Sequence, residues 1–318
     1  MDDFRILTDS TSDLSQQMVD ELDVTVIPMD FTIGSDAFKD YPDDRSISAH
    51  AFYTRIAAGE PSTTTQISVV TFTETFEPFL KEGKDVLYLA FSSGLSGTYN
   101  NSQQLSQKVP DRKIYTVDTR AASLGEGLLV WYAVQMKRAG RSIDEVRDWE
   151  ERSRCRMHHW FTVNDLNHLK RGGRISGASA LVGSVLGIKP VLHFDDEGHI
   201  RLVDKIRGRR QSLDDMVRHM ERTAEDPQKQ MIFISDGDSP EAAEYVKEKV
   251  AEKFGVERFG KASIGPVIGA HTGTGTIALF YLGKDREYEQ TESARTARRG
   301  GVSPQAPTEP VSARRRER

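Results

Sequence analysis

The residues best suited to hold an anion lie in the segment 91–98, Phe-Ser-Ser-Gly-Leu-Ser-Gly-Thr. The segment follows an apolar run, residues 85–91, which is typical of a strand covered on both faces, and it leads into a predicted helix. Ser92, Ser93 and Gly94 therefore lie where a strand ends and a helix begins. Free backbone N–H groups and the helix dipole favour a negative group at such a junction. The segment thus predicts an anion-binding site.

Two other interpretations fit the same junction. On the first, Ser96 is only the N-cap of the helix and the glycines beside it only form a turn. On the second, the protein is a serine hydrolase, but the Gly-Leu-Ser-Gly of residues 94–97 is one residue short of a nucleophile elbow. The order of Ser93 and His271 in the chain would permit a serine–histidine pair, although spacing identifies no acid partner.

Two further segments carry candidate site residues. Residues 61–68, Pro-Ser-Thr-Thr-Thr-Gln-Ile-Ser, include Thr64 and have too many hydroxyl groups for a buried element, so we expect a polar loop. His271 lies in the glycine-rich segment 264–275, also predicted to be a loop, where glycine would let the imidazole face an open cleft. Both segments are therefore candidates for contact with the anion.

Acidic and hydroxyl side chains also follow the first predicted strand, residues 4–7. Ser12 and Asp13 are predicted to cap the helix over residues 14–22. Asp9 and Ser10 lie closer to the strand end, so they either line a site or brace the loop.

The basic candidates are Arg174 and Arg207. Gly172 and Gly173 let the chain leave a helix and fix the position of Arg174, with a purely structural helix end as the alternative. Arg207 belongs to the basic cluster 205–210, which is either a solvated face or a contact for phosphate or a partner. The cysteine and two histidines within residues 155–159 do not predict a metal site, because adjacent histidines point to opposite sides of a strand.

Composition limits the class of protein. The chain has 318 residues, a net charge of −5 and one cysteine, which excludes an internal disulfide and favours a reducing, cytoplasmic location. Residues 290–318 contain seven arginines and three glutamates, a local net charge of +4, so the rest of the chain has a net charge of −9. This acidic body argues against nucleic acid as the main partner. Lys189 and Pro190 break the weakly polar run 175–192, so we expect no integral membrane segment.

The order of elements predicts an α/β protein with two domains. Strands and helices alternate through residue 154, which is typical of a parallel sheet covered by helices. Residues 155–286 predict a second domain with a mixed α/β sheet and a helix of small apolar residues over 175–186. Residues 287–318 predict a disordered basic tail. A monomer is the default expectation.

Five ordered motifs resemble the DegV family of bacterial fatty-acid-binding proteins. They are residues 7–14 (LTDSTSDL), 61–68, 92–99 (SSGLSGTY), 172–175 (GGRI) and 264–275. The resemblance implies a protein without a cofactor of its own that holds one long-chain fatty acid between two domains. It also implies the non-catalytic, lipid-binding subunit of fatty acid kinase, whose separate kinase subunit supplies ATP and magnesium and forms acyl phosphate for phospholipid synthesis.

The resemblance also assigns residues. Those implied to hold the carboxylate or to lie near it are Thr64, Ser93, Ser92, Gly94 and His271, and those implied to contact phosphate or the kinase subunit are Arg174 and Arg207. Two alternatives stay open at this stage. One is an acyl hydrolase with Ser93 and His271, and the other is a lipid transport or sensor module without a kinase partner.

Overall fold

The computed structural model describes residues 4–106, 112–164, 166–175 and 187–286. All of these residues belong to one compact unit, Met1–Tyr288. Of the helix predicted over 175–186, only Ile175 is described, and the predicted tail lies outside the described residues.

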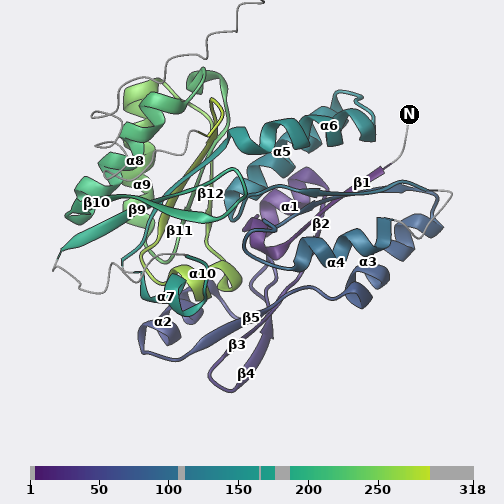
Figure 1. Cartoon of the computed structure of the whole chain (residues 1–318), viewed down its shortest axis with the longest axis horizontal. Helices are drawn as coiled ribbons and strands as arrows, with labels where there is room; N and C mark the ends of the chain where they lie inside the picture. Colours follow the sequence, from purple (N-terminus) through teal and green to yellow (C-terminus); the bar gives the residue numbers. More distant parts are fainter. Residues whose placement is uncertain (1–3, 107–111, 165, 176–186, 287–318) are drawn as a thin grey trace, which may run out of the picture. The chain divides into compact units, whose positions relative to one another are not determined.

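The first half of the chain forms a parallel sheet with the strand order β2-β1-β6-β7 (Figure 1). Its strands are β1 (Phe4–Asp9), β2 (Thr25–Ile27), β6 (Asp85–Ala90) and β7 (Ile114–Asp118). The side chains of residues 86–90 in the central strand β6 are all buried, as a strand covered on both faces requires. The prediction of a parallel, helix-covered sheet is confirmed.

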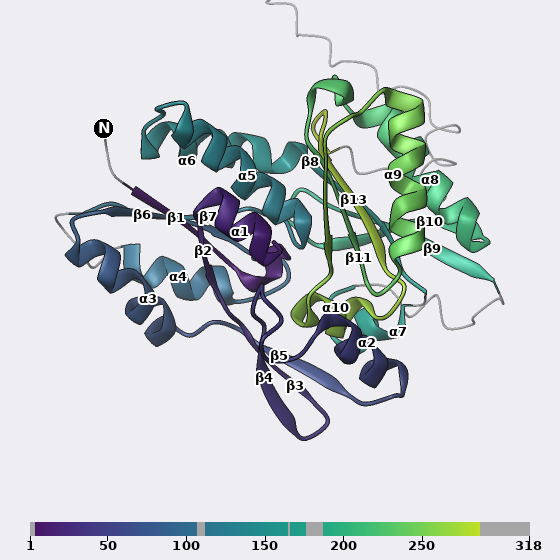
Figure 2. The ribbon, with the colours of Figure 1, turned by 180° about the vertical axis from the view of Figure 1, so that it is seen from behind.

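Helices cover both faces of this sheet. Figures 1 and 2 show α5 and α6 on one side and α3 and α4 on the other. The helices of this half are α1 (Gln16–Leu22), α2 (Ala49–Ala57), α3 (Val69–Lys81), α4 (Thr98–Ser106), α5 (Leu124–Arg138) and α6 (Ile143–Ser153), with the 3-10 turn η1 (Ser10–Ser12). The cap of α1 is Ser15, whose side chain accepts from Met18 N–H, so the predicted capping by Ser12 and Asp13 is wrong.

A small antiparallel sheet with the order β4-β3-β5 lies below the parallel sheet in Figure 1. Its strands are β3 (Asp30–Ile33), β4 (Asp36–Lys39) and β5 (Ser62–Thr65). Residues 62–65 were expected in a loop. They form a strand because β-branched threonine suits extended backbone and because β3 supplies the pairing, with Thr64 opposite Phe31.

The second half forms a mixed sheet with the order β10-β9-β8-β13-β11-β12, in which only β11 and β12 pair in parallel among the described strands. Its strands are β8 (Met157–Thr162), β9 (Ile188–Phe194), β10 (Ile200–Arg207), β11 (Ile232–Asp236), β12 (Phe259–Ser263) and β13 (Ile277–Leu282). The predicted mixed sheet is confirmed. That the two halves are separate domains, 1–154 and 155–286, stays a prediction.

Helices complete the second half. They are α7 (Asn167–Arg171), α8 (Arg209–Thr223), α9 (Pro240–Phe254) and α10 (Pro266–Thr272), with the 3-10 turns η2 (Arg154–Arg156) and η4 (Pro227–Lys229). Helices α8 and α9 contribute to an apolar core with one face of the sheet. Residues 266–272 were expected in a loop, so the prediction for the glycine-rich segment is wrong there. Within the described ranges, no helix is long and apolar enough to cross a membrane.

Candidate functional site

A cavity of about 370 Å³ is lined by residues from both halves of the described chain. Most of its surface is apolar, with Met29, Phe91, Leu95, Ala122, Phe161, Leu169, Phe194, Ile200, Ile264, Val267, Ile268, Ala278 and Phe280. Its polar lining consists of Thr64, Thr65, Gln66, Ser96, Gly97, Ser123, His159, Arg174, His271, Thr272 and Thr276. An apolar cavity with a few polar groups suits an elongated amphipathic ligand better than a small, fully polar one.

The alternation of side chains along β8 and β13 shapes the apolar wall. His159 and Phe161 line the cavity, whereas Trp160 between them packs into the core under α8 and α9. Phe280, paired with His159 across the strands, continues the wall. Burial lowers the pKa of His159 well below its usual value, so the ring is neutral and adds no charge to this wall.

The polar end of the cavity joins β5 to α10. Thr64 Oγ1 lies 2.9 Å from His271 Nε2, across 207 positions of sequence. Burial, with a smaller contribution from the Arg174 charge, lowers the pKa of His271 to about 4, so the imidazole is neutral at pH 7. Gly172 makes this placement possible, because a Cβ there would lie 2.2 Å from His271 Nδ1.

Arg174 provides the positive charge at this end of the cavity. Its Nε donates to Leu95 O at 3.2 Å, and its Nη1 donates to Gly172 O. The first contact ties the arginine to the loop between β6 and α4, where Ser96 and Gly97 also line the cavity. Thr64, Ser96, Arg174 and His271 therefore share one cavity and can together hold an anionic group.

Buried carboxyl groups position α10, which carries His271. Asp13 Oδ1 accepts from Gly265 N–H at 2.9 Å, and Asp40 Oδ2 accepts from Val267 N–H at 3.3 Å. Burial raises the pKa of Asp40 to about 7 and that of Asp13 well above its usual value. These contacts hold the start of α10, a helix inside the glycine-rich segment 264–275 that local sequence did not predict.

The residues at the end of β1 brace loops and do not line the cavity. Asp9 is buried and accepts from the Tyr88 hydroxyl at 2.5 Å and from Thr11 N–H at 3.0 Å. Ser10 Oγ accepts from Met29 N–H at 3.1 Å. Of the two roles open for Asp9 and Ser10, the structure supports the bracing one.

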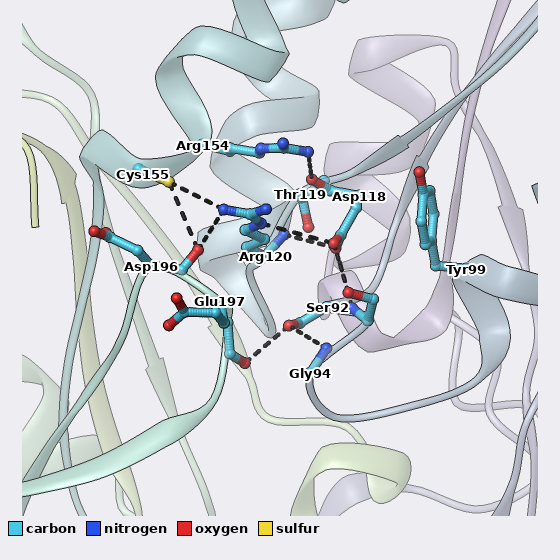
Figure 3. Close-up of polar contacts among 12 residues, drawn as sticks. Ser92, Gly94, Tyr99, Asp118, Thr119, Arg120, Arg154, Cys155, Asp196 and Glu197 are labelled. Atoms are coloured by element: carbon cyan, nitrogen blue, oxygen red, sulfur yellow. Dashed lines mark hydrogen bonds and ion pairs between the residues drawn. The ribbon is translucent and has the colours of Figure 1, made fainter.

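Ser92 and Gly94 are occupied with contacts outside the cavity lining (Figure 3), and the same holds for Ser93. Ser92 Oγ donates to Gly198 O at 2.8 Å and accepts from Gly94 N–H at 3.2 Å. Ser93 directs its N–H and its hydroxyl to Asp118, at 3.0 and 2.6 Å. The carboxylate of Asp118 thus occupies the Ser93 donors that the sequence suggested for a ligand.

The remaining sequence candidates divide in the same way. Thr64, His271 and Arg174 line the cavity, whereas Arg207 is exposed at the end of β10 and does not line it. Ser93 and His271 are not paired with each other, since the Ser93 hydroxyl donates to Asp118 and His271 contacts Thr64. The sequence interpretation treated Ser96 only as a cap, and Ser96 Oγ does accept from Thr98 N–H at 3.2 Å. No local signal separates Ser96 from Ser93, because the difference depends on the contact of Ser93 with Asp118.

Three comparisons place the chain among known proteins. A family model described as an uncharacterised protein of the DegV family matches residues 3–284. A DegV domain-containing protein of Clostridium perfringens is 44% identical over 291 residues, covering 90% of this chain and 100% of the relative. A second, from Lactococcus lactis, is 36% identical over 291 residues, covering 89% of this chain and 99% of the relative.

Solved structures agree with these sequence matches. A DegV family protein from Thermus thermophilus, described by its fatty acid binding, is 31% identical with a TM-score of 0.81, covering 88% of this chain and 99% of its own. DegV of Bacillus subtilis, described as a fatty acid binding protein, is 26% identical with a TM-score of 0.77, covering 89% and 100%. These relatives share both the fold and nearly the full length of the described chain.

Proposed function

The chain belongs to the DegV family, and from that premise we propose that it binds one long-chain fatty acid in the cavity between its two halves. The observation that carries the proposal is the cavity itself, an apolar space that ends at Thr64, Ser96, Arg174 and His271. The fatty acid binding described for the relatives from Thermus thermophilus and Bacillus subtilis supports the same ligand class.

The carboxylate would lie at the polar end, with hydrogen bonds from the hydroxyls of Thr64 and Ser96. Arg174 supplies the charge there, because neutral His271 can only donate or accept a hydrogen bond. We place the serine contact at Ser96 rather than at Ser93, because Ser96 lines the cavity and Ser93 donates to Asp118. Ser92 and Gly94 then support the loop rather than the ligand.

The alkyl chain would supply most of the affinity. Each buried methylene contributes ~0.8 kcal/mol, so a long chain against Phe161, Phe194 and Phe280 yields a large gross gain. The polar contacts then fix which end of the ligand enters the polar end of the cavity. Gly198 and Ser92 join the loop after β6 to the β9–β10 turn, which helps to keep the cavity in shape.

The further role in this proposal is that of a non-catalytic cytoplasmic carrier. A separate kinase subunit would phosphorylate the bound carboxylate, and the acyl phosphate would enter phospholipid synthesis. The resemblance supports this role, and the exposed Arg207 in the basic cluster 205–210 is a candidate contact for that subunit. Arg174, inside the cavity, is a candidate contact for the phosphate.

Measuring the binding of a fatty acid to the delipidated protein tests the proposed ligand. Adding a cognate kinase subunit and assaying acyl phosphate tests the proposed carrier role. We expect saturable one-to-one binding of oleate or palmitate, and acyl phosphate only when both proteins and ATP are present. If the fatty acid binds but no acyl phosphate forms, the protein would instead be a lipid transport or sensor module without a kinase partner. Labelling of Ser93 by a fluorophosphonate probe would instead support the hydrolase, which the contact between Ser93 and Asp118 does not favour.

A further inference from the structure

Three metal-ligating side chains converge on the side of the mixed sheet opposite the cavity. They are Asp204 of β10 and Asp215 and His219 of α8, whose ligand atoms all lie within 4.8 Å of one another. Asp204 Oδ2 lies 3.0 Å and Asp215 Oδ2 lies 3.4 Å from His219 Nε2. We propose that these residues bind a divalent transition-metal ion, with zinc as the best fit.

The distances suit zinc. At zinc bond lengths of about 2.0–2.2 Å, tetrahedral ligand atoms lie roughly 3.3–3.6 Å apart. The 3.4 Å between Asp215 Oδ2 and His219 Nε2 is within this range, and the 3.0 Å hydrogen-bond distance from Asp204 Oδ2 to His219 Nε2 has to open by a few tenths of an ångström. One imidazole and two carboxylates are a donor set that zinc accepts, whereas calcium and magnesium prefer oxygen ligands alone. The side chain of Asp204 is 32% exposed, which leaves a path for entry and room for a water as fourth ligand.

The fold directs each ligand toward the others. Asp215 and His219 are four residues apart on α8, so they lie on one face of the helix, and both are buried. Asp204 follows an irregularity in the pairing of β10 with β9, between Leu202 and Asp204, of the kind that re-aims a side chain. Trp160 stacks on the His219 ring, with centroids 3.6 Å apart and planes at 10°, which fixes its orientation.

One atom in the cluster points to a ligand by itself. Asp215 is 3% exposed, and its Oδ2 accepts no hydrogen bond from any described residue. Its other oxygen accepts from Arg218 at 2.6 Å, so the carboxylate is held in place while Oδ2 faces His219. A buried carboxylate oxygen without a donor is costly, and a cation beside it would remove that cost.

Two arginines set the conditions for binding. Arg218 stays on Asp215 Oδ1 as an outer partner that orients the ligand. Arg222 Nη2 lies 2.6 Å from His219 Nδ1 and 3.5 Å from His219 Nε2, so its positive charge lies beside the proposed metal position. A metal ion there is repelled by that charge, so the exposed Arg222 must turn away when the ion binds. Affinity should therefore rise when Arg222 is replaced by glutamine, which has no charge.

Trp160 provides a reporter for the test. The full-length protein is stripped with EDTA and titrated with Zn²⁺, following thermal unfolding and, in a Trp131→Phe/Trp149→Phe background, the emission of Trp160. We expect a saturable one-to-one change in emission, a rise in Tm of several degrees, and no response to Mg²⁺. In the protein with all its tryptophans, Co²⁺ should give the visible absorption of a four-coordinate site with nitrogen and oxygen ligands.

Variants separate this site from adventitious binding. Asp204→Asn and His219→Gln should each weaken zinc binding at least tenfold, and Arg222→Gln should strengthen it. His199→Gln is the matched control, because His199 belongs to the other acidic cluster with Asp195 and Glu197 and should not matter. Zinc binding that survives Asp204→Asn, or a wild-type Tm that does not change at saturating zinc, would overturn the proposal. Since Asp204 is partly exposed, its variant should fold even if the His219 variant does not.

Discussion

Thr64 Oγ1 and His271 Nε2 lie 2.9 Å apart although 207 positions separate them in the chain. The pair joins a strand of the small antiparallel sheet to a helix of the second half, and both residues line the apolar cavity. The polar end of the cavity is therefore assembled by tertiary structure, and neither residue lies at the strand end where the sequence placed the anion.

Removing either member of this pair should weaken fatty acid binding. Thr64→Ala and His271→Ala each delete one hydrogen-bonding group at the carboxylate, at a cost of about 1–3 kcal/mol, or roughly 5- to 150-fold in Kd. Isothermal titration with oleate measures the loss. Thr63→Ala on the exposed face of β5 is the matched control and should bind as the wild type does. Equal affinities for Thr64→Ala and Thr63→Ala would refute the assignment of Thr64.

Ser93 and Ser96 should behave differently when each is replaced by alanine. Ser96→Ala removes a cavity hydroxyl and should raise the Kd for oleate about tenfold, as expected for one lost hydrogen bond to a carboxylate. Ser93→Ala leaves Asp118 without its 2.6 Å donor, so it should lower the free energy of unfolding by about 1–3 kcal/mol with little change in affinity. The opposite pattern would return the serine contact to Ser93.

Asp40 should make the stability of the protein depend on pH. Its folded pKa is raised from 3.8 to about 7, chiefly by burial, so its contribution is fully present below pH 3.8 and is lost as pH rises to about 7. Asp40→Asn should remove that decline, with a difference from the wild type on the order of a few kcal/mol across this window. Urea unfolding at a series of pH values measures it. Parallel curves for the two proteins would contradict a raised pKa at Asp40.

Glu150 should be a site where an apolar residue stabilises the fold. It is fully buried in α6, burial raises its pKa well above the usual value, and neither carboxyl oxygen has a hydrogen-bond partner among the described residues. Glu150→Met should raise the free energy of unfolding at pH 8 by about 1–3 kcal/mol, and by less at pH 5, because a carboxyl group whose folded pKa is raised destabilises the fold more as the pH increases. Glu151→Met, at an exposed position, is the control. A loss of stability in Glu150→Met would show that the carboxyl group has a stabilising partner.

The parts of the fold that were predictable have strong local signals. The apolar run of β6 and the capping box at Ser142 and Glu145 identify their elements without tertiary information. Helix α10 and strand β5 lack such local signals. The glycines in and around α10 and the run of hydroxyl side chains in β5 are both typical of loops. Their structure depends on partners distant in sequence, Asp13 and Asp40 for α10 and β3 for β5.

The candidate site was predictable only in part, for a related reason. The motifs contain Thr64, Arg174 and His271, which do line the cavity. The choice between Ser93 and Ser96 depends on Asp118, which binds the donors of Ser93 from the end of the neighbouring strand β7. No local pattern around residue 93 contains that information.

Native mass spectrometry of the purified protein, followed by extraction and identification of the bound molecule, is the most direct test of fatty acid binding. We expect one long-chain fatty acid per chain, lost or exchanged more easily in Thr64→Ala and Ser96→Ala than in Thr63→Ala. A ligand-free mass, with no uptake of added oleate or palmitate, would contradict fatty acid binding and reopen the hydrolase and small-anion interpretations.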